Sequence, residues 1–266
     1  MEQGLPVDVY IGGVEHAVMH LLYARFVAKF LVDDGVIDPL GCAMPNGEPF
    51  TKLVSQGLVK TDTFSDAQGR YTATPSKVRR VEKMSKSKMN GVDPTSVIDS
   101  YGSDVARLYI LSKASPQDPI IWDIKGVVGM DRWMRRLWAL LDECWPELFG
   151  RRESVMKSAD EIPHIEVAWP LVDDSVVCSG SGDICDKYTR LVGGHFGQMR
   201  LHLCITELLK MTREITEIQI SNEKELGAKR NACIRLLELL LPFAPRTSSH
   251  ILSRLAQLNA RLNRTE

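Results

Sequence analysis

The sequence contains no uncharged apolar run of about eighteen residues, so we expect none of its segments to span a membrane. Its first residues, MEQGLPVDVY, show neither the basic start of a secretory signal nor the Arg- and Ser-rich pattern of an organellar leader, and we expect no targeting segment here. The six cysteines are scattered without a Cys-x-x-Cys pair, which argues against a zinc ribbon and against a secreted disulfide framework. These absences favour a soluble protein of a reducing compartment.

The sequence also lacks an excess of charge of either sign, because its formal net charge is only −1. The charges are unevenly spread, however. Between Lys77 and Asn90 there are six basic residues and one acidic residue, whereas Gly150 to Asp186 holds three basic and eight acidic residues. From Lys187 to Glu266 there are thirteen basic and seven acidic residues. Since local clusters set the field that a phosphate feels, the two basic segments are the candidates for contact with nucleotides or nucleic acid.

The start of the chain predicts a βα unit. The segment VDVYIGG, Val7 to Gly13, combines β-branched and aromatic residues with paired glycines, which is typical of a short buried strand that runs into a turn. Apolar residues then fall on nearly every face between Val14 and Leu31, and this pattern predicts a helix that is packed on both sides. A strand, a glycine turn and a buried helix together indicate an open α/β domain.

The next part of the sequence is more polar. Residues 33–50 are rich in Gly, Pro and Asp and predict a loop, and residues 53–60 predict a helix end followed by a second short strand. Residues 61–76 are polar and turn-like. Residues 77–91 have little apolar periodicity and end in Asn-Gly, so we expect an exposed loop there.

The rest of the sequence is helical in its periodicity. Capping signals predict one helix from Asp93 to Tyr101, where Gly102 stops it, and another from Ser103 onward. Four longer helices follow, and short turns between them predict a bundle; they cover residues 130–145, 188–220, 224–241 and 247–262. We therefore expect an α/β domain over residues 1–124 and an all-α bundle over residues 125–266, with an acidic linker at 150–186.

The strongest chemical signal is KMSKS, Lys83 to Ser87, in the first basic segment. Lysines in a flexible basic loop can surround a triphosphate, and their charges count most where negative charge passes to a leaving pyrophosphate. Lys86 is the best single candidate. Taken alone, such a run is more often a solvated basic loop or a localisation patch, so its context decides.

That context is the turn from Gly12 to His16. Two glycines let a ligand approach the backbone, a carboxylate at Glu15 can accept hydrogen bonds from ribose hydroxyls, and the imidazole of His16 can contact adenine or phosphate. We also expect a helix N-terminus here, which favours an anion. His16 and His20 have the spacing of a zinc pair, but the glutamate of an HExxH motif and a third ligand are missing, so we expect no metal site and a packed His20.

Five blocks of the sequence, in this order, resemble those of the class I leucine–tRNA ligases of the mitochondrial and bacterial type. They are YIGGVEHAVMHLLYARF (10–26), PFTKLVSQGLVK (49–60), EKMSKSKMNGVDP (82–94), YGSDVARLYIL (101–111) and the segment around Trp122. The resemblance implies part of a Rossmann-type catalytic domain followed by an anticodon-binding helical bundle. It further implies activation of leucine with ATP and Mg²⁺ and transfer to tRNA(Leu).

Carried over by position, the resemblance implies roles for individual residues. Lys83 and Lys86 would be catalytic. The ATP or adenylate pocket would be formed by Gly12, Gly13, Glu15, His16, Met84, Ser85, Lys86 and Ser87. Phosphates of the tRNA would be contacted by Lys187, Arg190, Arg200, Lys229, Arg230 and Arg235.

The sequence also departs from the family pattern. The HIGH-type signature, the leucine pocket and the editing domain of the family are not found in it, so we expect no activity from this chain alone. Arg246 stands where relatives carry His after the PFAP motif, and GGHFGQMR (193–200) differs from the usual bundle helix. Two alternatives stay open: a non-catalytic protein that binds tRNA or other RNA, and an isoleucine- or valine–tRNA ligase. The resemblance favours a monomer in the mitochondrial matrix, with the cytoplasm as the alternative.

Overall fold

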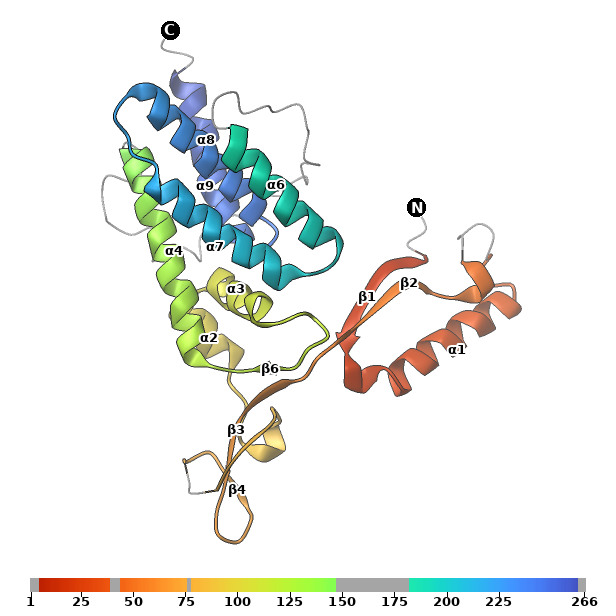
Figure 1. Cartoon of the computed structure of the whole chain (residues 1–266). Coiled ribbons are helices and arrows are strands. Elements are labelled where there is room, and N and C mark those ends of the chain that lie inside the picture. The colour runs from red at the N-terminus through yellow and green to blue at the C-terminus, as the bar shows by residue number, and fades with distance from the viewer. Residues whose placement is uncertain (1–4, 39–43, 76–77, 147–181, 263–266) are drawn as a thin grey trace. The chain divides into compact units, whose positions relative to one another are not determined.

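The computed structural model describes residues 5–38, 44–75, 78–146 and 182–262 (Figure 1). The chain divides into two compact units, of which the first comprises Met1–Val92 and Ala114–Trp122, and the second Asp93–Lys113 and Asp123–Glu266. The first unit is α/β and the second is helical, so the predicted fold class is confirmed. The acidic linker predicted at residues 150–186 lies outside the described residues except for its last five, which form the start of a helix, so the prediction is wrong for these five.

A parallel βαβ unit opens the first compact unit. Strand β1 (Val7–Gly13) pairs in parallel with β2 (Phe50–Gln56), in a register that runs from Val7↔Phe50 to Gly13↔Gln56. Helix α1 (Met19–Asp33) lies between them in the sequence, after a short 3₁₀ turn η1 (Val14–His16). The predicted first strand is confirmed, but the prediction that it is buried is wrong, since none of its residues is buried. The α-helix begins five residues later than expected.

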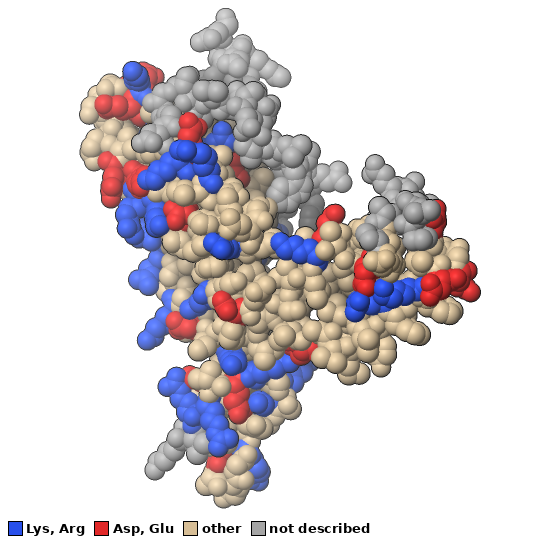
Figure 2. Space-filling view, turned by 45° about the vertical axis from the view of Figure 1, so that its right-hand side comes forward, with Lys and Arg blue, Asp and Glu red and all other residues tan. Residues whose placement is uncertain are grey.

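Helix α1 is packed on one side only, so the prediction of a helix buried on both sides is wrong. Leu21 and Ala28 are buried, whereas Val18 is 76% exposed and Phe26 is 66% exposed. Figure 2 shows the resulting broad uncharged surface over α1. Helix α1 is apolar on nearly every face, as the sequence predicts. The two-stranded sheet, however, offers only one face for packing, and within the described residues nothing covers the other side of the helix. The large apolar side chains left exposed on and just before α1 are Val14, Val18, Met19, Leu22, Tyr23, Phe26, Val27 and Phe30.

A second, twisted sheet completes the first unit, and we call it the hairpin sheet. Its central strand β3 (Val59–Ser65) pairs antiparallel with β4 (Tyr71–Thr72) and β5 (Val78–Lys83), and parallel with β6 (Ile120–Ile121). Three expectations are therefore wrong. No helix ends within residues 53–60, where β2 ends and β3 begins. Residues 61–65, expected to be turn-like, belong to β3, and the first half of the expected loop at 77–91 is strand β5. Pairing with β3, from Lys60↔Lys83 to Ser65↔Val78, overrides the weak local pattern.

Gly57 makes the passage from β2 to β3 possible. Its N–H donates to the carbonyl of Pro116 at 2.9 Å. A Cβ atom at this position would lie 2.1 Å from the carbonyl oxygen of Asp118, so no larger residue fits without moving the backbone. The glycine thus lets residues 114–122 return to the hairpin sheet and add β6 to it.

The second unit begins with two short helices whose ends match the sequence signals. Helix α2 (Pro94–Tyr101) is capped by Asp93, which accepts from the backbone N–H groups of Thr95 and Ser96, and it ends at Gly102 with a φ of +84°. Helix α3 (Ser103–Lys113) packs against helices of the bundle. Residues 93–113 therefore cluster with the helical unit, although the sequence prediction places them in the α/β domain.

The bundle places helices α6 to α9 side by side, with α4 against α7 and α8 (Figure 1). The helices are α4 (Ile124–Cys144), α6 (Gly182–Gly197), α7 (Leu201–Glu217), α8 (Glu223–Leu240) and α9 (Pro245–Leu262). The single helix predicted over residues 188–220 is wrong, because α6 and α7 are separated by a turn in which Met199 has a φ of +58°. Three glycines in GGHFG weaken the helix just before this turn.

The bundle has a continuous apolar core. Leu137, Leu208 and Leu237 are fully buried, and the indole N–H of Trp133 donates to Thr212 Oγ1 at 3.1 Å within the core. Within the described ranges, no helix has the length and apolarity that crossing a bilayer requires.

Candidate nucleotide site

The turn after β1 and the KMSKS segment touch each other. Strand β1 ends at Gly13, strand β5 ends at Lys83, and Lys83 Nζ lies 2.7 Å from Glu15 Oε1. Both side chains stay partly exposed. The hydrogen bond from Lys83 holds the pKa of the Glu15 carboxyl below its ordinary value. Two motifs that are 68 residues apart in the sequence therefore share one place in the first unit. This place is the carboxyl end of a parallel strand pair, where ligands of open α/β sheets bind.

The backbone of the turn differs from the sequence expectation in one respect. Glu15 and His16 lie in the 3₁₀ turn η1 and not in the first turn of an α-helix, so the predicted anion site at a helix N-terminus is not formed by these residues. Gly13 gives the Glu15 carboxylate its room, since a Cβ atom there would lie 2.6 Å from Glu15 Oε2. His16 is exposed, and its ring is available to a ligand.

His20 lies beside Tyr10 of strand β1 but is exposed, so the prediction of a packed His20 is wrong. Its Nε2 atom shares a hydrogen bond with the hydroxyl group of Tyr10, and the two rings lie with their centroids 5.7 Å apart. A search of the described residues finds no group of three side chains that could hold a metal ion.

The KMSKS segment follows β5 as a compact turn. The N–H of Met84 still donates to the carbonyl of Val59 at 3.0 Å, and a 3₁₀ turn η3 (Lys86–Lys88) comes next. The hydroxyl groups of Ser85 and Ser87 lie 2.8 Å apart. Lys86 is exposed, and no carboxylate among the residues that the structure describes pairs with it. Of the two predicted catalytic lysines, Lys86 therefore has its ammonium group available, and Lys83 is paired with Glu15.

Lys88, which directly follows the KMSKS segment, has a structural role. Its Nζ atom lies 2.7 Å from Glu82 Oε2 and 5.7 Å from the centre of the Tyr71 ring. The hydrogen bond to Glu82 raises the pKa of Lys88. Lys88 thus fastens the end of the turn to β5 and β4, which distinguishes it from Lys86.

Asn90 is a residue of this site that sequence reasoning missed. It is only 9% exposed, and its side-chain amide bonds to the backbone on both sides of Met84. The dipeptide Asn-Gly predicts a turn, and a turn signal assigns no role to the asparagine side chain. A polar residue whose side chain is buried beside a basic motif is visible only in the structure.

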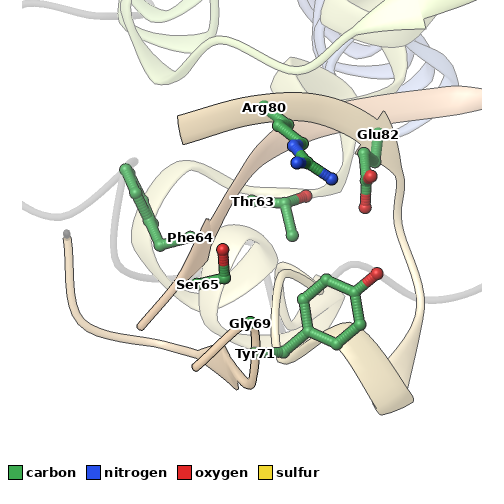
Figure 3. Close-up of a pocket in the computed structure, with 7 residues that line it drawn as sticks. All are labelled: Thr63, Phe64, Ser65, Gly69, Tyr71, Arg80 and Glu82. Atoms are coloured by element: carbon green, nitrogen blue, oxygen red, sulfur yellow. The ribbon is translucent and has the colours of Figure 1, made fainter. Parts of the chain in front are cut away.

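A shallow pocket lies on the hairpin sheet beside this turn (Figure 3). It encloses about 340 Å³, including the open space at its mouth. In Figure 3 the side chains of Arg80 and Glu82 lie on the strand above the pocket and the Tyr71 ring stands across from them. The lining residues are Thr63, Phe64, Ser65, Gly69, Tyr71, Arg80 and Glu82. None of them is a predicted ATP-site residue, so this pocket is distinct from the Glu15–Lys83 site.

Comparison with known proteins shows which family this chain resembles. Residues 37–123 match the family described as tRNA synthetases class I (I, L, M and V). A leucine–tRNA ligase of Parasynechococcus marenigrum is 36% identical over 265 residues, which cover 93% of this chain and 28% of that ligase. The chain is homologous to part of a class I leucine–tRNA ligase. It thus spans little more than a quarter of the length of such a relative.

Further relatives agree with this assignment. A mitochondrial leucine–tRNA ligase of Dictyostelium discoideum is 40% identical over 160 residues, which cover 50% of this chain and 16% of the relative. Among solved structures, the LeuRS of Agrobacterium radiobacter K84, crystallised as a ternary complex with tRNA and LeuAMS, superposes with a TM-score of 0.64 at 26% identity. That match covers 93% of this chain and 27% of the other. Relatives therefore include both bacterial and mitochondrial proteins.

The structure separates the predicted tRNA contacts of this chain into two groups. Three of them are engaged within the bundle. Lys229 is 1% exposed, and its ammonium donates to Glu143 Oε1 at 2.7 Å and to the carbonyl of Ile218 at 3.1 Å. This placement argues against Lys229 as a phosphate contact. The sequence held the signal, because Lys229 shares a helical stripe with the buried residues Cys233 and Leu236.

The other two residues of this group are also held by the bundle. Arg230 donates from Nε to the carbonyl of Cys144 at 2.8 Å, and its guanidinium lies 5.6 Å from the centre of the Trp145 ring. Arg235 has a largely buried side chain that pairs with Glu238 at 2.9 Å. Their charges are therefore used for packing α8 and are poorly placed for a large ligand.

The remaining predicted contacts lie on the surface of α6 and at the start of α7. Lys187 is partly exposed and paired with Glu214 at 2.7 Å. Arg190 and Arg200 are exposed. Within the described part of the bundle, these three keep basic groups at the surface and remain the predicted tRNA contacts.

Proposed function

We propose that this chain forms the part of a leucine–tRNA ligase that holds the phosphates of ATP and contacts tRNA(Leu). In the whole enzyme, leucine would be activated to leucyl-adenylate and transferred to the 3′ end of the tRNA. The observation that supports this most strongly is the 2.7 Å contact between Glu15 and Lys83, because it puts the glycine turn and the KMSKS loop at one site. The leucine-specific names of the relatives favour leucine over isoleucine or valine.

The side chains of the site suit a nucleoside triphosphate. Lys86 offers an unpaired ammonium group among the described residues, and Lys83 offers a second one once Glu15 turns to another partner. In adenylate formation, a leucine carboxylate oxygen bonds to the α-phosphorus and the bond to the β-phosphate breaks, so negative charge collects on the departing pyrophosphate. Lys83 and Lys86 would stabilise that charge, and Glu15 would accept hydrogen bonds from ribose hydroxyls.

Class I tRNA synthetases use ATP with a divalent metal ion. The donor set fits the triphosphate rather than the metal, since the single carboxylate of Glu15 is already paired with Lys83 and the exposed Lys86 adds a second cation on the same loop. We propose that Mg²⁺ enters with ATP, bound through phosphate oxygens, where it would neutralise phosphate charge. The chain's own part is to position the phosphates through Lys83, Lys86 and the backbone near Gly12 and Ser85.

The first test is the variant Lys86→Ala, in the longest polypeptide that the gene encodes. Leucine-dependent exchange of pyrophosphate into ATP should slow by roughly 100-fold or more, as when one preorganised charge-stabilising group is removed. Binding of tRNA(Leu) should change by less than about twofold, because a single phosphate contact is worth little among many. Lys52→Ala, which removes an exposed lysine of β2, is the matched control. An unchanged exchange rate in Lys86→Ala would remove Lys86 from the mechanism.

A second candidate function is RNA binding without catalysis. The exposed apolar face of α1 favours RNA binding without catalysis for the 266-residue chain by itself, because an α/β unit with an uncovered face offers only part of an active site. The 266-residue chain alone should show negligible exchange, since leucine cannot be held against the α-phosphate. Exchange at a rate typical of an enzyme would contradict this expectation. If the longest encoded polypeptide binds tRNA(Leu) but is also inactive in exchange, the non-catalytic function is the correct one.

We also propose a monomer that works in the mitochondrial matrix, with the cytoplasm as the alternative. Mitochondrial and bacterial relatives support both locations. A fluorescent fusion to the longest encoded polypeptide would decide between the compartments. Sedimentation of the same polypeptide would measure its oligomeric state.

A further inference from the structure

Asn90 lies behind the KMSKS turn and contacts it from three directions. Its Oδ1 atom accepts from the N–H of Ser85 at 2.8 Å, and its Nδ2 atom donates to the carbonyl of Lys83 at 3.2 Å. The same Nδ2 donates to Thr63 Oγ1 at 2.6 Å, on the central strand of the hairpin sheet. From this geometry we infer that Asn90, anchored by Thr63, is the positioning residue that fixes the loop in the shape that presents Lys86.

The chemistry of these bonds requires an amide. The carboxamide supplies an acceptor oxygen and two N–H donors, and the three contacts engage the oxygen and both donors. Alanine would remove every contact, and aspartate would replace the donors with acceptors beside the Lys83 carbonyl. Thr63 is only 3% exposed, so Asn90 Nδ2 is bonded to a buried hydroxyl of the hairpin sheet and not to solvent. Buried polar groups that are fully satisfied in this way specify one local conformation.

The path of the backbone explains why the amide can reach both sides of Met84. Two turn hydrogen bonds of 3.2 Å, from Lys88 N–H to the Ser85 carbonyl and from Met89 N–H to the Lys86 carbonyl, tighten the segment. Met89 then adopts a φ of +53°, in the left-handed region, and the chain returns so that the side chain of residue 90 meets Ser85. The turn is thus closed through the Asn90 side chain, with the exposed Lys86 inside the closed segment.

A closed turn has a consequence for ligand binding. A lysine on an open loop loses conformational freedom when it meets phosphates, whereas a lysine on a fixed turn has already lost the backbone part of that freedom. Asn90 does not touch the reacting atoms, so it acts through the position of Lys86. The identity of the ligand rests on the proposed function; the closure of the turn does not.

The closure is tested by hydrogen exchange of the Ser85 amide in the 266-residue chain. In Asn90→Ala this amide should exchange about tenfold faster or more than in the unsubstituted chain, since it loses its acceptor. Thr63→Val has nearly the volume of threonine and lacks only the hydroxyl, so it should give a smaller acceleration in the same direction. Thr63→Ser keeps the hydroxyl and should restore slow exchange. Thr72→Val, on strand β4 of the same sheet, is the control and should leave Ser85 unaffected.

The functional arm uses leucine-dependent pyrophosphate exchange by the longest encoded polypeptide, with variants compared at equal folded fraction. Asn90→Ala and Thr63→Val should lower kcat by roughly tenfold with an unchanged KM for leucine, and Thr63→Ser should recover it. A role in overall stability alone would not produce this split.

The outcomes are separable. Unchanged exchange of the Ser85 amide in both Asn90→Ala and Thr63→Val would overturn the inference, whatever the enzymatic result. Faster amide exchange with unchanged kcat would show a closed turn that does not position Lys86, and would overturn the inference as well. If the unsubstituted polypeptide shows no pyrophosphate exchange, the proposed function fails, while the amide measurement still decides whether Asn90 closes the turn.

Discussion

The helical unit buries its large apolar side chains, whereas helix α1 of the α/β unit leaves most of its own exposed. In the bundle, Leu208 on α7 has no exposed surface, and the same is true of Leu137 and Leu237 on neighbouring helices. On α1, Leu22 is 59% exposed, and a whole face of the helix shares this exposure. In the sequence, α1 is more apolar than α7 or the neighbouring bundle helices. The difference shows that the bundle holds a core of its own, whereas the βαβ unit covers only one face of its helix.

This comparison agrees with the extent of the homology. The chain spans 28% of the length of its cyanobacterial relative, so most of that ligase has no counterpart in it. An apolar helix face of this size is usual for a surface that another part of a protein covers. The uncovered face of α1 therefore supports the proposal that the chain alone forms no adenylate.

The largest expected effect is a matched pair of leucine truncations. Leu208→Ala should lower the free energy of unfolding of the bundle by about 2–5 kcal/mol, since it leaves a cavity in a filled core. Leu22→Ala should change stability by less than about 0.5 kcal/mol, because most of this side chain is already in water. Urea denaturation followed by circular dichroism measures both. A large loss from Leu22→Ala would show that α1 is covered in solution, and would break the comparison.

An intermediate effect is expected where the bundle buries a charge. Glu143→Ala should lower the free energy of unfolding by about 1–3 kcal/mol, because it leaves the Lys229 ammonium without its carboxylate; the half-exposed glutamate reduces the usual cost. Glu207→Ala removes the partner of the exposed Lys210 on α7 and should cost under about 1 kcal/mol. Equal urea midpoints for the two variants would contradict the burial of Lys229.

The smallest effect is expected on α1 and depends on pH. Arg25, and after it Lys29, lower the pKa of Glu48 to about 2, so this contact is formed by the ionised carboxylate. A depressed pKa stabilises the fold above the ordinary glutamate pKa, and this contribution is lost as the pH falls from about 4.3 toward 2. Amide exchange of α1, corrected for intrinsic rates, should accelerate by roughly twofold to fivefold across that range. In Glu48→Gln, the amides of α1 should exchange at pH 6 as fast as those of the unsubstituted chain do at acidic pH. If they do not, the ion pairs of Glu48 contribute nothing to the stability of α1.

Much of the fold could be predicted because its signals are local. Strand β1 and helices α2, α3 and α8 begin and end near residues that the sequence marks, such as Asp93 and Gly102. Helix α4 ends near Pro146 as predicted but begins at Ile124, before the predicted start at residue 130. Strand β5 was missed because its stability comes from pairing with β3, which lies elsewhere in the chain. The break between α6 and α7 was missed although Gly193, Gly194 and Gly197 signalled it.

The candidate site divides in the same way. Lys83, Lys86, Glu15 and His16 follow from motifs and from the resemblance, and the structure brings Glu15 and Lys83 together. The burial of Lys229 and the anchoring of Asn90 follow from packing, because Glu143 lies 86 residues from Lys229 and Thr63 lies 27 residues from Asn90 in the sequence. No periodicity argument alone identifies the acceptor or donor that such a residue meets.

The most direct measurement of the central claim is acylation of the lysines in the 266-residue chain, followed by mass spectrometry, with and without MgATP. If the turn at Glu15 and the KMSKS loop form one phosphate site, MgATP should slow acylation of Lys86 by roughly threefold or more and leave the exposed Lys52 unchanged. Equal rates at Lys86 with and without saturating MgATP would contradict the account.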